Sequence, residues 1–239
     1  MATNNNHPTP LGIYVHFPFC LKKCPYCDFT SYDDSTVDRS SYINAVVAEF
    51  NSFRDFLDSD FEVGSLYFGG GTPSLMEPGM VEKVIKAVHH SYELSSDAEI
   101  TLEVNPATAS AEDMRAWRKS GVNRVVIGVQ STDRKNLQVL GRLHSPKDAA
   151  GAIETARGAR FDTVGIDLIF GIPGQTRANW EKDLERAIEI NPDHVSAYML
   201  KPPRGWNVPP DEETGEMYLK GVERLEAAGE TVVTVNAGP

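Results

Sequence analysis

The sequence lacks any hydrophobic run that approaches the roughly 20 apolar residues needed to cross a bilayer. Its first ten residues, MATNNNHPTP, contain no charged segment followed by an apolar one and no arginine-rich amphipathic pattern. They therefore do not resemble a targeting peptide. We expect residues 1–10 to form a disordered tail on a cytoplasmic protein that does not insert into membranes.

Positive charge is also scarce. The sequence contains 23 Lys and Arg residues against 34 Asp and Glu residues, so its net charge is −11. A nucleic-acid-binding surface is normally basic, so this balance argues against DNA or RNA as a partner. With 239 residues and 41% hydrophobic content, the chain is long enough to bury a core without disulfides. The composition excludes collagen-like, low-complexity and wholly disordered chains.

Cysteine is almost absent: the only three, Cys20, Cys24 and Cys27, lie within eight residues. An odd, clustered set is not a disulfide framework, and it indicates a metal or redox site in a reducing compartment. Thiolates are the usual ligands of iron–sulfur clusters, and three of them would leave one iron of a four-iron cluster open. The alternative is a structural zinc ion with His16 as the fourth ligand, although such sites usually contain two cysteine pairs.

Strand-like and helix-like segments alternate along the chain. Strands are predicted at 11–17, 63–71, 98–105, 122–130, 161–171 and 193–200, and helices at 40–57, 77–92, 110–119, 133–140, 146–158, 177–190 and 211–228. This alternation predicts a parallel sheet with right-handed crossovers, and apolar residues at both alternate positions suggest that both faces of the sheet are buried. Six strand–helix units are fewer than the eight of a complete barrel. We expect an α/β fold, a partial TIM-like (β/α)6 barrel over residues 11–230, with a doubly wound open sheet as the alternative.

Polar and glycine-rich segments follow the ends of these strands. They are Gly69–Thr72, Glu103–Pro106, Gln130 and Asp167–Gly171, and the cysteines follow the first strand. In parallel α/β folds this edge of the sheet holds the active site. Glycines allow a ligand to approach backbone amides, a strand carboxylate such as Asp167 needs a partner, and Arg142 can pair with a carboxylate. A tight turn, a core ion pair and a solvated surface arginine are the ordinary alternatives.

Several segments resemble one known group of proteins. In order, they are IYVHFPFCLKKCPYCDF, YFGGGTPSL, LEVNP, VIGVQS, LGRLHS, DLIFGIPGQT and NPDHVSAY. Over residues 11–228 the sequence resembles the radical S-adenosylmethionine (SAM) superfamily. Within it, the sequence is similar to the subfamily of oxygen-independent coproporphyrinogen III oxidases (HemN type) and related haem chaperones (HemW type). The resemblance implies that Cys20, Cys24 and Cys27 ligate a [4Fe–4S] cluster.

The resemblance also implies roles for other residues. The open iron would be chelated by the amino and carboxylate groups of SAM, and SAM would be cleaved to methionine and a 5′-deoxyadenosyl radical. Tyr14 and His16 match positions close to the cluster and cofactor and are candidate catalytic residues, and Tyr26 matches an aromatic residue beside the adenine. The remaining implied SAM contacts are Gly70, Gly71 and Thr72 at the methionine end, and Glu103, Gln130, Arg142 and Asp167 elsewhere.

One departure indicates the type within the subfamily. The similar oxidases have a fourth cysteine two residues after the third, where this sequence has Phe29. In this the sequence resembles the HemW-type haem chaperones. The resemblance then implies haem binding, a haem-acceptor protein, and an electron donor such as flavodoxin or ferredoxin. The alternative is a coproporphyrinogen III oxidase, which oxidatively decarboxylates propionates. A third is an interaction protein that has lost the cofactor.

The end of the sequence is a second departure. Members of the subfamily continue into a C-terminal domain, whereas here ERLEAAG is followed by ETVVTVNAGP. We expect residues 231–239 to be a divergent C-terminal tail of a truncated or frame-shifted copy that lacks this domain.

Overall fold

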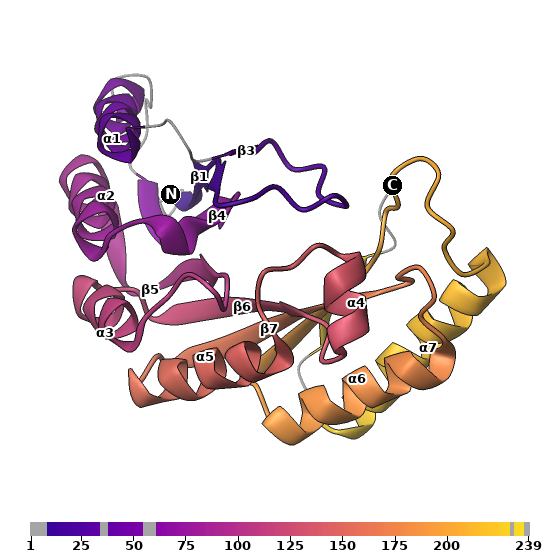
Figure 1. The fold of residues 1–239 in the computed structure, drawn as a ribbon. Helices are drawn as coiled ribbons and strands as arrows, with labels where there is room; N and C mark the ends of the chain where they lie inside the picture. The colour runs from indigo at the N-terminus through magenta and orange to yellow at the C-terminus, as the bar shows by residue number, and fades with distance from the viewer. Residues whose placement is uncertain (1–8, 34–37, 55–60, 230–231, 237–239) are drawn as a thin grey trace, which may run out of the picture.

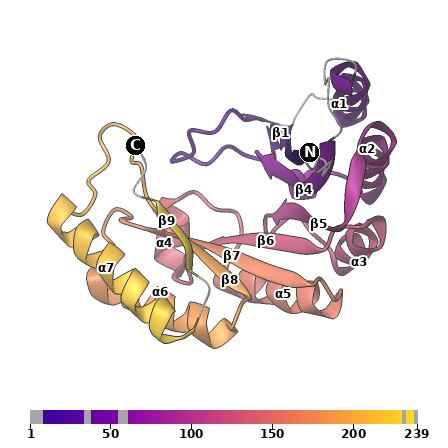
Figure 2. The same ribbon diagram turned by 180° about the vertical axis from the view of Figure 1, so that it is seen from behind.

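The computed structural model describes residues 9–33, 38–54, 61–229 and 232–236 (Figures 1 and 2). Seven parallel strands form one sheet, and each strand pairs with the next one in sequence. They are β1 (Thr9–Phe17), β4 (Phe61–Gly70), β5 (Glu93–Val104), β6 (Arg124–Gln130), β7 (Thr163–Phe170), β8 (His194–Met199) and β9 (Val232–Asn236). A doubly wound sheet reverses its strand order at a switch point. The sequential order therefore confirms the partial barrel and excludes the doubly wound alternative.

Helices cover the outer side of the curled sheet (Figures 1 and 2). They are α1 (Arg39–Arg54), α2 (Pro78–Ser91), α3 (Ala111–Ser120), α4 (Arg134–Val139), α5 (Pro146–Gly158), α6 (Arg177–Ile190) and α7 (Asp211–Ala227). Every predicted strand and helix is present. Four short elements were not predicted: the paired strands β2 (Phe19–Cys20) and β3 (Tyr32–Asp33), the 3-10 helix η1 (Pro73–Leu75), and the last strand, β9.

Local sequence sets where several helices begin. Ser110, Ser145 and Thr176 precede α3, α5 and α6, and each side chain accepts a hydrogen bond from the backbone amide three residues later. The side chain at that third position binds the backbone amide of the cap residue in return, which completes a capping box. These caps fix the points at which the chain turns from the sheet edge into the outer layer.

The two faces of the sheet differ in character. The outward side chains of β6 and β7 are apolar and buried against the helices, as in Val125, Ile127 and Ile166. Because side chains alternate along a strand, the residues between them point into the barrel. Several inward residues of these strands and of their neighbours β5 and β8 are polar, among them Glu103, Arg124, Gln130, Asp167 and Ser196. Inward residues such as Val126, Ile169 and Ser196 are also buried, so both faces of the sheet are buried as expected, but the outer face is the more apolar one.

The chain ends also differ from expectation. Residues 1–8 of the expected N-terminal tail lie outside the described residues, and β1 already begins at Thr9. Within the expected C-terminal tail, Val232–Asn236 pairs with β8 as a seventh parallel strand. Among the described helices, none combines the length and the apolar character needed to span a bilayer.

A buried carboxylate ties the outer layer to the sheet edge. Asp183 of α6 is 1% exposed. It accepts hydrogen bonds from the Ser131 hydroxyl at 2.7 Å, the Thr132 amide at 2.7 Å and the Asn136 side chain at 3.5 Å, and also from the Thr132 hydroxyl. These bonds hold the segment that follows Gln130 at the end of β6.

Replacing Asp183 should destabilise the fold strongly. Asp183→Ala leaves several buried donors without an acceptor, so we expect the free energy of unfolding to fall by about 3 kcal/mol. Urea denaturation followed by circular dichroism measures this change. Asp162→Ala is the matched control, because Asp162 pairs with Arg118 at the exposed surface and its loss should cost less than about 1 kcal/mol. Equal losses in the two variants would contradict the role given to Asp183.

Candidate functional site

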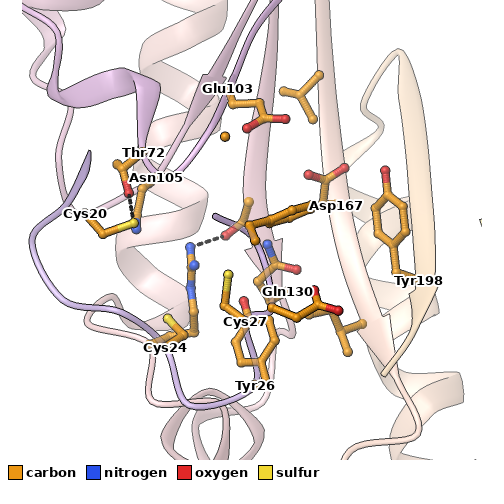
Figure 3. A pocket seen from close by; sticks show the side chains of 18 of the residues that line it. Cys20, Cys24, Tyr26, Cys27, Thr72, Glu103, Asn105, Gln130, Asp167 and Tyr198 are labelled. Carbon is orange, nitrogen blue, oxygen red and sulfur yellow. Dashed lines mark hydrogen bonds between the residues drawn. The ribbon is translucent and has the colours of Figure 1, made fainter. Parts of the chain in front are cut away.

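A cavity of about 310 Å³ lies at the edge of the sheet where the strands end (Figure 3). It brings together all the predicted site residues except Tyr14 and His16. Those that line it are Cys20, Cys24, Tyr26, Cys27, Gly70, Gly71, Thr72, Glu103, Gln130, Arg142 and Asp167. They come from the loop after β1 and from the ends of β4, β5, β6 and β7, and Arg142 follows α4.

The chain between β1 and β3, residues 18–31, contains the three cysteines and is called the cysteine loop here. The pairing of β2 with β3 closes it, and in this pairing Cys20 lies opposite Asp33. The Cys20 sulfur accepts a hydrogen bond from the Thr72 hydroxyl at 3.4 Å. The Cys24 sulfur lies 4.0 Å from the Gly141 carbonyl, and the Cys27 amide donates to the Cys24 carbonyl at 3.1 Å. Figure 3 shows the three sulfur atoms on the side of the cavity that this loop forms. The loop therefore presents three thiols to one space.

The donor set fits an iron–sulfur cluster better than a single ion. Among the described residues, no group of three His, Cys, Asp or Glu side chains is placed to hold one metal ion. His16, the fourth ligand of the zinc alternative, instead has its Nε2 atom 2.9 Å from the Thr30 carbonyl. In a four-iron cluster each cysteine binds a different iron, so the sulfurs need not converge on one point. Lys22 also lines the cavity and adds positive charge near the thiols.

Gly70 and Gly71 line the cavity as expected, and they also allow a close backbone contact. A Cβ atom at Gly70, whose φ is +118°, would lie 2.8 Å from the His16 ring. One at Gly71 would lie 2.8 Å from the backbone of Pro18 and Phe19. The Gly71 amide donates to the Phe17 carbonyl at 2.8 Å. The glycines therefore allow the cysteine loop to lie directly against the end of β4, besides lining the cavity.

Tyr14 and His16 lie on β1, outside the residues that line the cavity. Tyr14 is 57% exposed, and its ring stacks on Tyr67 with a centroid separation of 5.8 Å. His16 contacts the Thr30 carbonyl at the far end of the cysteine loop. The structure thus places both residues beside the site, where they contact residues that shape it.

Two carboxylates face the cavity. Glu103 at the end of β5 accepts a hydrogen bond from the Tyr67 hydroxyl at 2.9 Å, and burial raises its pKa. Burial raises the pKa of Asp167 on β7 to about 7, and the negative charge of Glu103 acts in the same direction. Neither forms a salt bridge with a cation of the described residues. They are suited to accept hydrogen bonds from the ammonium or hydroxyl groups of a ligand.

Arg142 and Tyr26 complete the wall. Arg142 donates from Nη2 to the Gly128 carbonyl at 3.0 Å, while its buried Nε has no partner among the described residues. A guanidinium whose buried Nε has no partner can bind a carboxylate. Burial is the main cause that raises the pKa of Tyr26 to about 12, so its phenol is neutral. The Tyr26 ring packs against Leu140 and its apolar neighbours.

Sequence reasoning missed several lining residues. Tyr198 of β8 is two residues after Ser196 on the inward face, so the alternation in HVSAY could have revealed it. Lys201 lies 4.0 Å from Asp28, which brings the connection after β8 against the cysteine loop. Such a contact between residues distant in sequence has no local signal.

Comparison with known proteins gives consistent matches. The model of the radical SAM superfamily matches residues 14–187. The haem chaperone HemW of Escherichia coli is 35% identical over 231 residues, which cover 92% of this chain and 60% of HemW. Radical S-adenosyl methionine domain-containing protein 1 of Bos taurus, a mitochondrial protein, is 38% identical over 229 residues, which cover 91% of this chain and 52% of that protein.

Among solved structures, coproporphyrinogen III oxidase (HemN) of Escherichia coli superimposes with a TM-score of 0.81 at 26% identity. The match covers 93% of this chain and 54% of the oxidase. The chain therefore spans between half and two thirds of the length of these relatives.

A side chain at Gly71 should displace the cysteine loop. Gly71→Ala places a Cβ atom against backbone atoms that cannot rotate away, and such overpacking costs about 1–3 kcal/mol. We expect alkylation of the buried Cys20, followed by mass spectrometry, to become about tenfold faster. Gly64→Ala is the matched control, because no atom lies within 4 Å of its added Cβ. Equal alkylation rates in the two variants would contradict this account.

The raised pKa of Asp167 predicts a pH-dependent stability. The folded chain holds this proton up to about pH 7, whereas an unfolded aspartate releases it near pH 3.9. Between these values the folded state binds more protons, so Asp167 lowers stability as the pH rises. Asp167→Asn should therefore stabilise the protein by about 2 kcal/mol more at pH 8 than at pH 5, measured by urea denaturation. If Asp167→Asn changed the free energy of unfolding by the same amount at pH 5 and pH 8, the raised pKa of Asp167 would be contradicted.

Proposed function

Because this chain belongs to the radical SAM superfamily, we propose that it is a HemW-type protein, which binds a [4Fe–4S] cluster and SAM and handles haem for transfer to an acceptor protein. The observation that supports this best is the single cavity that joins the cysteine loop to the candidate SAM contacts. An electron donor such as flavodoxin or ferredoxin belongs to the same proposal. The three free thiols fit a reducing compartment such as the cytoplasm.

The residues of the cavity divide between the two cofactors. Cys20, Cys24 and Cys27 would hold the cluster, which leaves one iron open for SAM. When bound, the cluster supplies the electron for reductive cleavage of SAM. The other residues bind and orient SAM. The unused Nε donor of Arg142 suits its carboxylate, and Glu103 suits its ammonium group.

The far end of SAM would meet a different set of groups. Asp167 suits the ribose hydroxyls, because a carboxylate accepts two hydrogen bonds from a diol. Tyr26 offers a neutral aromatic ring to the adenine, and Gln130 offers an amide that both donates and accepts. Both residues line the same cavity as Asp167.

Phe29 favours the chaperone over the oxidase. It lines the cavity, is 65% exposed, and stands where the similar oxidases have a further cysteine. Its exposed ring offers apolar surface at the rim, which suits a macrocycle such as haem. The second candidate, coproporphyrinogen III oxidase activity, is favoured by the structural likeness to HemN.

Anaerobic reconstitution with iron and sulfide tests the cofactor assignment. We expect about four irons per chain and an electron paramagnetic resonance signal of the reduced protein that changes when SAM is added. Cys24→Ala should lose most of the iron, whereas Leu21→Ala, an exposed residue of the same loop, should retain it. Arg142→Gln should keep the iron and weaken SAM binding about tenfold. Zinc in place of iron, or no effect of SAM, would contradict the assignment.

Haem handling is tested on the same reconstituted sample. A haem titration followed by absorbance should saturate at about one haem per chain, with no release of carbon dioxide from coproporphyrinogen III. Decarboxylation without haem binding would instead favour the oxidase.

A further inference from the structure

A row of polar groups crosses the interior of the barrel next to the cavity. Arg124 Nη2 lies 2.7 Å from His194 Nδ1, and His194 Nε2 lies 2.9 Å from the Ser196 hydroxyl. Ser196 is the register partner of Asp167 across β7 and β8, so the two side chains lie next to each other on the inner face, and the Ser196 hydroxyl acts to lower the pKa of the Asp167 carboxyl. Asp167 lines the cavity, whereas Arg124, His194 and Ser196 do not.

The first link of this row passes over a whole strand. Arg124 belongs to β6 and His194 to β8, with β7 between them. Gly165 of β7 is the register partner of His194, and a Cβ atom there would lie 3.4 Å from His194 Nδ1. Gly165 therefore lies directly beneath the imidazole ring, and the contact between Arg124 and His194 passes over β7 where that strand has no side chain.

The chemistry of the groups fixes the direction of each hydrogen bond. A guanidinium only donates, so His194 Nδ1 accepts and the ring proton must lie on Nε2. Nε2 then donates to the Ser196 oxygen, which leaves the hydroxyl proton of Ser196 free for its neighbours Asp167 and Tyr198. The two hydrogen bonds that lead from Arg124 to Ser196 therefore both point toward the side of the barrel on which Asp167 lies.

Arg124 is held firmly in this position. Its side chain is 13% exposed, and Nη1 lies 3.2 Å from both the Glu99 carboxylate and the Thr101 hydroxyl. A buried cation of this kind keeps His194 neutral, since burial and the Arg124 charge both lower the pKa of His194. The row therefore has one defined protonation pattern.

We propose that Arg124, His194 and Ser196 are positioning residues that favour the ionised form of the Asp167 carboxyl group and hold it facing the cavity. The inference rests on the proposed function, in which Asp167 binds the ribose hydroxyls of SAM. These residues act through Asp167, since none of them lines the cavity.

Other charged and titratable groups act on Asp167 from the surrounding elements. Burial and the Glu103 charge of β5 favour the protonated acid, while Ser196, Arg124 and Arg142 favour the carboxylate. The remaining titratable groups that face this part of the interior are Tyr67 of β4, Glu99 of β5, and His194 and Tyr198 of β8. Removal of Ser196 or Arg124 should therefore raise the pH at which Asp167 ionises.

Carbon-13 NMR of the chain labelled at aspartate carboxyl groups tests this directly, with the Asp167 resonance assigned by its loss in Asp167→Asn. We expect a titration midpoint near pH 7 in the unmodified chain, raised by about one unit in Ser196→Ala and in Arg124→Gln. Arg118→Gln is the matched control, because it removes the same charge from an ion pair at the outer surface. It should leave the midpoint unchanged.

An unchanged or lowered midpoint in either test variant overturns the proposal. If Arg124→Gln fails to fold by circular dichroism, Arg124→Lys replaces it. Lysine keeps the charge but loses the fork of donors, so its midpoint should rise by less than one unit. Ser196→Ala removes a single oxygen and decides the question independently.

SAM binding by the reconstituted chain separates this inference from the proposed function. A one-unit rise makes Ser196→Ala bind SAM about fivefold more weakly at pH 7 but almost normally at pH 9, where Asp167 is again ionised. A loss that is equal at both pH values would show a merely structural role and contradict the proposal. If the unmodified chain binds no SAM while the NMR midpoint still shifts, the proposed function fails and the positioning row stands.

Discussion

The direct backbone contact between the cysteine loop and the end of β4 is the constraint on which the site depends. The Gly71 amide binds the Phe17 carbonyl at 2.8 Å, and no Cβ atom separates Gly71 from Pro18 and Phe19. This contact fixes the path of the chain where the loop leaves β1. It therefore also fixes where the three thiols lie relative to the edge of the sheet. Thr72, the next residue, then donates to the Cys20 sulfur.

The sheet that supports this contact has two different faces. Its outer face is apolar and packs against the helices, which supplies most of the hydrophobic core. The inner face is therefore free to hold polar groups such as Glu103, Arg124 and Asp167. Parallel pairing in sequential order brings the ends of these strands to one edge. The polar interior and the cysteine loop meet at this edge, and together they line one cavity.

Much of this could be predicted from the sequence, because the signals are local. The alternation of strands and helices predicted the partial barrel, and the spacing of Cys20, Cys24 and Cys27 predicted the candidate cluster site. The conformation of Gly70 and the stacking of Tyr14 on Tyr67 could not be predicted, since they depend on how β1 packs on β4. The row from Arg124 to Asp167 was likewise hidden, because it joins three strands and crosses Gly165, whose missing side chain has no signal in sequence.

Mössbauer spectroscopy of the chain reconstituted with iron-57 tests the central claim most directly. Three cysteines for four irons leave one iron without a protein ligand, so that iron differs from the other three and is the one that SAM can reach. The account predicts that SAM changes the spectrum of one iron site in four and leaves the others unchanged. A spectrum that SAM does not alter, or one that changes equally at all four sites, would contradict it.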